Sequence, residues 1–196
     1  MKSGHTPEVA ASRGPDEAAV RLRGVAYVIR PLRPDDEQRL QDFFYSHSKE
    51  TIQLRYGYMI STMTHERAYE LVNVDQQKDV ALGIFEAAAS SPALDAVGRY
   101  YSDAGGKEAE IAFVVRESKR RCGMASTLIK HMAEYAQRHG IVTFVANVLR
   151  DNEEMRSLFA HYSPEVSSLI GSAWLTYRLP VELILAPARG HPGRRP

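Results

Sequence analysis

The segment KRRCGMAS, residues 119–126, constrains the fold of this chain more than any other. It follows the apolar run IAFVV (111–115), typical of a buried strand, and it opens the stretch MASTLIKHMAEYAQRHG (124–140), whose apolar residues recur at helical spacing. A strand, a glycine turn and a helix in this order bring unpaired backbone N–H groups and the positive end of a helix dipole to one point. The segment therefore predicts a site for a phosphate group.

The spacing of this loop excludes two common phosphate-binding motifs. It lacks the Gly-Lys-Ser/Thr of a Walker loop. It also lacks the G-x-G-x-x-G of a dinucleotide fold, with an acidic residue about 20 positions later. The motif present is Arg120-x-x-Gly123-x-Ala125, in which Gly123 lets the backbone approach an anion closely and the arginines add positive charge.

Around the loop, apolar periodicity alternates between strand and helix. Strands are expected over residues 25–32, 79–87, 95–103, 109–115 and 141–149, and strand-like residues return over 168–183. Helices are expected over residues 34–48, 64–73, 124–140 and 151–162. The run 141–149 is nearly all apolar, which indicates a strand covered on both faces. The pattern predicts an α/β domain with a mixed central sheet of six to seven strands flanked by helices.

The two ends of the chain differ from its middle in composition. Residues 1–23 are rich in Ala, Gly, Pro and charged residues, and the end APARGHPGRRP is rich in Pro and Gly. We therefore expect disordered tails over residues 1–23 and 187–196, and a single folded domain over residues 24–186.

Composition limits the setting and the partners. The formal net charge is +1, so no overall field attracts nucleic acid or an anionic membrane. No stretch approaches the roughly 18 apolar residues of a membrane span, and the N-terminus lacks the apolar centre of a secretory signal. Cys122 is the one cysteine, so no intrachain disulfide can form, and His65, His131 and His161 have no partner at zinc-ligand spacing. These features predict a cytoplasmic protein that needs no metal, nucleic acid or membrane.

The loop resembles the signature of the GNAT N-acyltransferase superfamily, (Gln/Arg)-x-x-Gly-x-(Gly/Ala), which follows a strand and opens a helix. The order of the expected elements fits that superfamily over about residues 26–180. The opening VIRPLRPDDEQRLQDFFYSHSKETIQLRYG (28–57) looks more specifically like the catalytic domain of bacterial protein lysine acetyltransferases, in which an IRP-P-D strand-to-helix entry precedes an S-E-T---R turn. The strand AEIAFVV (109–115) is similar to theirs as well.

The resemblance implies a fold, a co-substrate and a reaction. Members hold acyl-coenzyme A (acyl-CoA) in a splayed notch, here between the strands 109–115 and 141–149, and bind its pyrophosphate with the backbone amides of the loop. It implies an acyl-CoA-dependent N-acetyltransferase that moves the acetyl group of acetyl-CoA directly to a primary amine, with a protein lysine as the acceptor and without a metal. The chain would act as a monomer or a homodimer. The residues that the resemblance assigns to acetyl-CoA are Phe113, Val114, Val115, Arg120, Arg121, Cys122, Gly123, Met124, Ala125, Ser126 and Asn152, and a strand N–H near Val114 or Val115 would donate to the thioester carbonyl.

At three positions this sequence differs from the residue that many family members carry. Arg121 and Ala125 stand where many members have glycine, and alanine is accepted at the second position. Many members carry a tyrosine seven residues after the helix-opening asparagine, as the acid for the departing thiolate; counted from Asn152, that position is Phe159. Tyr162 is out of register by three residues. Because a cysteine-like thiol has a pKa near roughly 8.5, the thiolate can leave without an acid.

Glu110 is the expected general base. A lysine arrives as an ammonium with a pKa near roughly 10.4 and cannot attack a thioester until it is deprotonated. Glu110 shares a strand face with Ala112 and Val114 in an otherwise apolar segment, where a carboxylate is costly unless it is paired or functional. In the lysine acetyltransferases that the chain resembles, a glutamate at this place serves as the base, directly or through water. The alternatives are that Glu110 merely ends the strand at a solvated mouth, or that Glu86 or Asp103 is the base.

Several residues keep a structural alternative. The two arginines of the loop could form a solvated basic turn. Cys122 at a helix N-terminus could act as a nucleophile, or could contribute only its amide. Asn152 could contact the coenzyme arm, or could belong only to the helix start, since Asp151 and Glu154 have capping-box spacing.

Two other functions fit the same residues. A transferase for a small amine, such as a polyamine, an amino acid or an aminoglycoside, would want several acidic residues in its cleft. A non-catalytic acyl-CoA-binding sensor would need no acid at Phe159. For a protein acceptor, we expect the segment IQLRYGYMISTM (52–63) to border the acceptor site, with Arg55 and exposed aromatic residues meeting the partner surface.

Overall fold

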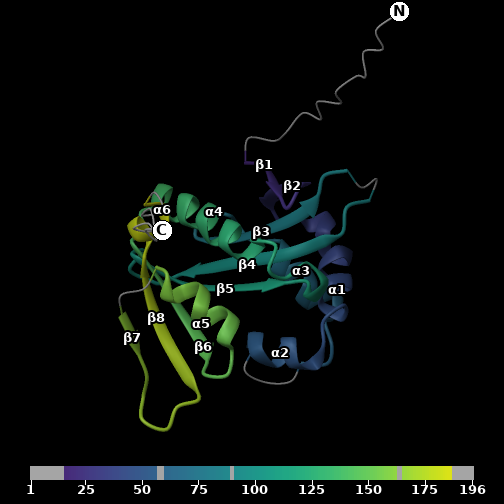
Figure 1. Cartoon of the computed structure of the whole chain (residues 1–196). Helices are drawn as coiled ribbons and strands as arrows, with labels where there is room; N and C mark the ends of the chain where they lie inside the picture. The colour runs from purple at the N-terminus through teal and green to yellow at the C-terminus, as the bar shows by residue number, and fades with distance from the viewer. Residues whose placement is uncertain (1–15, 57–59, 89–90, 163–164, 187–196) are drawn as a thin grey trace, which may run out of the picture.

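The computed structural model describes residues 16–56, 60–88, 91–162 and 165–186. Within them the chain forms one mixed sheet with helices on both faces, in the strand order β1-β2-β3-β4-β5-β6-β8-β7 (Figure 1). The α/β class is confirmed, with eight strands in place of six to seven. The strands are β1 (Ala18–Leu22), β2 (Val25–Pro31), β3 (Asp79–Glu86), β4 (Leu94–Ser102), β5 (Glu108–Val115), β6 (Thr143–Leu149), β7 (Glu165–Ser167) and β8 (Trp174–Pro180). The helices are α1 (Glu37–Tyr45), α2 (Lys49–Tyr56), α3 (His65–Val72), α4 (Met124–Arg138), α5 (Glu153–Ala160) and α6 (Val181–Leu185), with 3-10 turns at Pro34–Asp36 and Glu117–Lys119.

Strands β5 and β6 are parallel, and their pairing is short. The register runs only from Glu108 opposite Thr143 to Glu110 opposite Val145. Beyond Glu110, β5 stays paired with β4 and β6 stays paired with β8, both in antiparallel register. The splayed notch expected from the sequence is therefore confirmed, and it opens at Glu110.

Apolar side chains fill both faces of the sheet. Helices α4, α5 and α6 cover one face, and α1 and α3 cover the other. Because β3 and β4 lie between these two layers, nearly all of their residues are buried. Successive strand residues alternate between the faces, so that Ile111 and Phe113 of β5 pack on the α4 side and Val114 packs on the α1–α3 side.

The predicted N-terminal boundary is wrong. Residues 18–22, expected in a disordered tail, form β1 and pair with β2. Val20 and Leu22 pack against the core while Ala19 and Arg21 are exposed, which is the alternation of an edge strand with one buried face. Residues 1–15 and 187–196 of the two expected tails lie outside the described residues.

Three elements differ from what the sequence predicts. The strand expected within residues 168–183 is confirmed as β8, but it is shorter, and α6 begins at Val181, which is buried against α4 and its neighbours. Strand β6 is buried at alternate residues rather than on both faces, and Asn147 is exposed. Helix α2 was not expected, because residues 49–56 show no clear apolar stripe. None of the helices in the described ranges has the length and apolar character needed to cross a membrane.

Candidate active site

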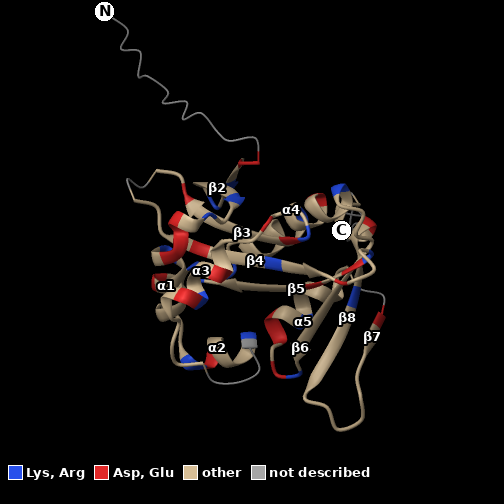
Figure 2. Ribbon diagram, turned by 180° about the vertical axis from the view of Figure 1, so that it is seen from behind, with Lys and Arg blue, Asp and Glu red and all other residues tan. Residues whose placement is uncertain are grey.

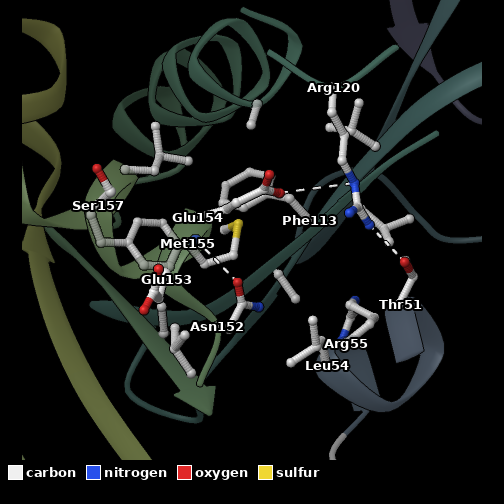
Figure 3. Close-up of a pocket in the computed structure, with 18 of the residues that line it drawn as sticks. Thr51, Leu54, Arg55, Phe113, Arg120, Asn152, Glu153, Glu154, Met155 and Ser157 are labelled. Carbon is white, nitrogen blue, oxygen red and sulfur yellow. Dashed lines mark hydrogen bonds and ion pairs between the residues drawn. The ribbon is translucent and has the colours of Figure 1, made fainter. Parts of the chain in front are cut away.

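A groove of about 1230 Å³ crosses the molecule at the notch between β5 and β6. Helix α2 and helix α5 stand on its two sides, and the loop before α4 and the second half of β5 complete it (Figure 3). The volume exceeds the roughly 300–1,000 Å³ of typical small-ligand sites, so the groove has room for a long ligand. The residues assigned from the sequence line it with the exception of Cys122; they are Glu110, Phe113, Val114, Val115, Arg120, Arg121, Gly123, Met124, Ala125, Ser126 and Asn152.

The loop before α4 leaves backbone donors open to an anion. Gly123 precedes the first helical turn with a φ of 86°, and no side chain caps that turn. The N–H groups of Met124, Ala125 and Ser126 therefore have no partner within the helix. A Cβ atom at Gly123 would meet only Leu22 Cδ2, at 3.9 Å, so the protein itself does not fill the space beside the glycine. These features fit the pyrophosphate of an acyl-CoA.

Two arginines precede Cys122 and Gly123 and differ in conformation. Arg121 is exposed and has a φ of 57°, in the left-handed region that favours glycine, which accounts for the glycine of many family members at this position. Arg120 points into the groove: its Nη2 donates to Thr51 Oγ1 at 2.6 Å, and its Nε lies 3.9 Å from Glu154 Oε2 (Figure 3). Arg120 thus touches both sides of the groove.

Every second residue of β5 directs its backbone N–H and C=O groups toward the notch. In an antiparallel pair, alternate residues direct their N–H and C=O groups at the partner strand. The N–H of Arg116 donates to Asp95 O at 2.8 Å on the β4 side, so the even-numbered residues of β5 face β4 and the odd-numbered residues face β6. Where β6 has parted from β5, the Val115 N–H is directed into the notch and the Val114 N–H is directed at β4. The geometry favours Val115 of the two expected donors.

Glu110 is the third residue of β5 and the last one paired with β6. Its side chain is exposed, lies opposite Tyr101 of β4 in the register, and lines the groove. Because Glu110 lies inside the strand, the alternative that it merely ends the strand is wrong. The structure places this carboxylate where the notch opens.

The two alternative bases lie elsewhere. Glu86 Oε2 pairs with Lys119 Nζ at 3.0 Å, and this bond raises the pKa of Lys119. Asp103 accepts the N–H groups of Lys107 and Glu108, each at 3.2 Å, in the β4–β5 turn, and the Glu108 N–H is the main cause that lowers the pKa of Asp103. Neither Glu86 nor Asp103 lines the groove. The three carboxylates therefore do not converge.

Helix α5 brings Asn152 and Phe159 to the groove. Asn152 Oδ1 accepts the Met155 N–H at 3.2 Å, so Asn152 itself, rather than Asp151, caps the helix (Figure 3). That bond leaves the amide nitrogen of Asn152 for other contacts. Phe159 is 1% exposed and forms an apolar wall where many family members have a tyrosine. Tyr162 packs against the same core and is not a lining residue.

A smaller cavity of about 40 Å³ adjoins the groove on the α1–α3 side of β5. Arg55, Ala112 and Val114 line both spaces. The other walls of the cavity are mostly apolar, but they include His47 and the buried guanidinium of Arg99. Figure 2 shows the wider distribution of charge over the ribbon, with acidic and basic residues interspersed.

Helix α2 is the wall of the groove that sequence reasoning missed. Thr51 and Leu54 line the groove from this helix, together with Arg55, which was expected near the acceptor (Figure 3). Trp174 adds an aromatic wall from β8 that no sequence pattern indicated. The one signal for α2 was the S-E-T---R pattern of the family resemblance. Residues 57–59 of the expected acceptor segment lie outside the described residues.

Comparison with known proteins decides the family. The family model of the acetyltransferase (GNAT) domain matches residues 27–162. The chain belongs to the GNAT acetyltransferase family. This is a family of acyl-CoA-dependent N-acetyltransferases, as the sequence resemblance implied, and it uses acetyl-CoA as its co-substrate. Within the described ranges, no three His, Cys, Asp or Glu side chains lie together as a metal site would require.

Solved structures of GNAT proteins share the fold. The GNAT domain of S. lividans PAT is 28% identical, with a TM-score of 0.74, over 84% of this chain and 96% of that chain. The cAMP-binding acyltransferase from Mycobacterium smegmatis is 20% identical, with a TM-score of 0.58, over 91% of this chain and 50% of that chain. A chimera of the Vibrio cholerae spermidine N-acetyltransferase SpeG and hSSAT is 14% identical, with a TM-score of 0.59, over 82% of this chain and 99% of that chain. The last two show the GNAT fold alone.

Proposed function

We propose that this GNAT protein transfers the acetyl group of acetyl-CoA directly to the amine of a protein lysine, with Glu110 as the general base. The observation that carries the proposal is the place of Glu110, at the point where β5 and β6 part and in the same groove as the phosphate loop. A donor whose pyrophosphate is bound at the loop and whose arm lies in the notch would present its thioester near this carboxylate.

Each step is assigned to a group of the chain. The Glu110 carboxylate accepts a proton from the lysine ammonium, whose pKa is near roughly 10.4 in solution. The neutral amine attacks the thioester carbon while the Val115 N–H donates to the carbonyl oxygen, where negative charge develops. The C–N bond forms, the C–S bond breaks, and the new amide loses its second amine proton to water. The sulfur leaves as a thiolate and takes its proton from solvent, because Phe159 has none to give.

Two likenesses support a protein lysine as the acceptor. They are the resemblance of residues 28–57 to bacterial protein lysine acetyltransferases and the likeness to the GNAT domain of S. lividans PAT.

One observation favours a second candidate, a non-catalytic acyl-CoA-binding sensor. Phe159 is buried where many family members keep a tyrosine that protonates the thiolate, and Tyr162 does not replace it in the groove. A sensor needs the loop and the groove but no leaving-group acid and no acceptor.

The test is release of CoA from acetyl-CoA in the presence of lysine peptides, whole-cell protein or small amines, with mass spectrometry of the acceptors. We expect turnover on lysines of a few proteins that exceeds turnover on spermidine or free amino acids. Faster turnover on a small amine would assign a small-molecule transferase. Tight binding of acetyl-CoA with no release of CoA on any acceptor would assign a sensor.

A further inference from the structure

The first turn of α2 is bonded to the 3-10 turn that precedes the phosphate loop. Glu117 Oε1 accepts the Ser48 N–H at 2.8 Å and the Thr51 hydroxyl at 2.6 Å. Ser48 Oγ in turn accepts the Thr51 N–H at 3.2 Å. The hydrogen bond from Thr51, with those from Ser48, lowers the pKa of Glu117 to about 2, so Glu117 is ionised at neutral pH. Part of the S-E-T---R pattern thus serves to dock α2 on the loop.

Thr51 connects this docking contact to the groove. Thr51 is only 5% exposed. Its hydroxyl donates to Glu117 Oε1 and accepts from Arg120 Nη2, each at 2.6 Å. A hydroxyl has one proton, so donation to the carboxylate turns its lone pairs toward the guanidinium. Both bonds involve an ionised partner and belong to the stronger class of hydrogen bonds.

The Thr51 contact, rather than the Glu154 contact, fixes Arg120. Glu154 is 3.9 Å from Arg120 Nε and its side chain is 54% exposed, as expected of a weak surface ion pair. An arginine side chain loses much rotamer freedom when it is fixed on a ligand, and less when the free protein already holds it. In Figure 3 the guanidinium of Arg120 lies between Thr51 and Glu154, so a bound pyrophosphate can replace Glu154 while Thr51 keeps its bond.

We propose that Thr51 is a positioning residue for the acyl-CoA pyrophosphate, because its hydroxyl holds the Arg120 guanidinium beside the amides of the phosphate loop. The proposal rests on the proposed use of acetyl-CoA by this groove. It makes α2, whose second half belongs to the segment 52–63 expected near the acceptor, a part of the donor site as well. Thr51 acts through Arg120 and touches no reacting atom.

The test is a double-mutant cycle on acetyl-CoA affinity, measured by calorimetry with the full chain. We expect Thr51→Val to weaken acetyl-CoA binding about tenfold, as the loss of an oriented charged contact does. Thr51→Ser keeps the hydroxyl, so its affinity should stay within about twofold of the wild-type value. In an Arg120→Ala background, Thr51→Val should change the affinity less than about twofold, because the group that Thr51 positions is gone. Thr64→Val is the control: Thr64 caps α3 through the Arg67 N–H at 3.2 Å and does not line the groove.

A second measurement separates positioning from a general effect on the fold. S-acetylpantetheine carries the thioester without the pyrophosphate, so Thr51→Val should turn it over at the wild-type rate while losing efficiency with acetyl-CoA. If Thr51→Val does not fold, Glu117→Gln replaces it in both experiments, with an expected loss of a few fold, because Glu117 orients the Thr51 hydroxyl.

The outcomes are distinct. Equal losses with and without Arg120, or equal losses on both donors, would overturn the proposal and make Thr51 a structural residue of α2. A wild-type chain that fails to bind acetyl-CoA would instead refute the proposed function.

Discussion

The donor end and the acceptor end of the groove are made of different parts of the polypeptide. At the donor end, the open N–H groups of Met124 to Ser126 and the left-handed Gly123 are backbone features of one short segment. At the acceptor end, side chains of α2, β4 and β5 line the groove and the adjoining cavity, among them Arg55, Arg99 and Glu110. The difference teaches that the backbone donors of the donor site depend on local conformation, whereas the side chains of the acceptor site, like the Thr51–Arg120 contact, depend on tertiary packing. Substitutions should therefore affect backbone geometry at one end and chemistry at the other.

The largest effect is expected at the acceptor end, for Glu110→Gln. General-base catalysis contributes about 10²–10⁴-fold, so turnover should fall within that range while acetyl-CoA affinity stays near the wild-type value. The defect should shrink as the pH rises, because more of the amine then arrives neutral. The measurement is the pH–rate profile beside calorimetric affinity. Glu50→Gln is the control, since Glu50 also lines the groove but lies on α2.

If Glu110→Gln keeps full turnover at neutral pH, Glu110 is not the base. A loss of acetyl-CoA affinity equal to the loss of turnover would mean instead that Glu110 belongs to the donor site, and the division between the two ends would fail.

The next effect is expected at the donor end, for Gly123→Val. A φ of 86° lies in the left-handed region, which costs a β-branched residue about 1–2 kcal/mol. The loop must therefore bear this strain or leave the conformation that presents its N–H groups to the pyrophosphate. No clash within the protein is expected, because a Cβ atom would meet only Leu22 Cδ2 at 3.9 Å. We expect acetyl-CoA affinity to fall about 5–30-fold, the factor that corresponds to this strain.

Gly140→Val is the matched control for Gly123→Val. Gly140 has a φ of 78° and open space around it, but it lies after α4 and outside the groove. Gly140→Val should lower the melting temperature while acetyl-CoA affinity stays unchanged. Wild-type affinity in Gly123→Val would show that the loop backbone does not hold the donor.

The same division explains what could be predicted from the sequence. Gly123, Arg120 and the first residues of α4 were found because strand, loop and helix are contiguous and their periodicity is local. Glu110 was found because it is the one carboxylate in the otherwise apolar run 109–115. Neither signal exists for α2. Its place in the groove depends on contacts of Thr51 with Glu117 and Arg120, which are 66 and 69 residues away in the sequence.

The errors have physical reasons of the same kind. Residues 18–22 look like a tail by composition, and only the pairing with β2 makes them a strand. The apolar run 141–149 suggested burial on both faces, but β6 lies next to the notch and away from the centre of the sheet, where α1 and α3 do not cover it. Long-range pairing and partial coverage leave no mark in a local window of sequence.

A smaller effect, on stability, is expected for Arg121→Gly. The φ of 57° at Arg121 is unfavourable for an arginine and neutral for glycine, although glycine also gives the unfolded chain more freedom. We expect a net gain of up to about 1 kcal/mol, which for a chain of this size raises the melting temperature by about 2–4 °C. Arg23→Gly, at a φ of 46° in the β1–β2 turn, is the comparison variant outside the groove. A lower melting temperature for Arg121→Gly would mean that its side chain contributes more than its backbone conformation costs.

The smallest effect is expected for Glu117, whose carboxylate joins α2 to the 3-10 turn before the phosphate loop. Its pKa is lowered to about 2 in the folded protein, from an ordinary value of 4.5, chiefly by the hydrogen bond from Thr51. Because the unfolded chain binds this proton more readily, the stabilisation is present above about pH 4.5 and is lost as the pH falls toward 2. Urea unfolding at pH 6, 5, 4 and 3 should show a steeper loss of stability for wild type than for Glu117→Gln. The difference between the two curves isolates Glu117 from Asp36, Asp75 and Asp103, whose pKa values are also lowered and which both chains share. Parallel curves would mean that the bonds from Ser48 and Thr51 do not hold in solution, and that α2 is not coupled to the phosphate loop through Glu117.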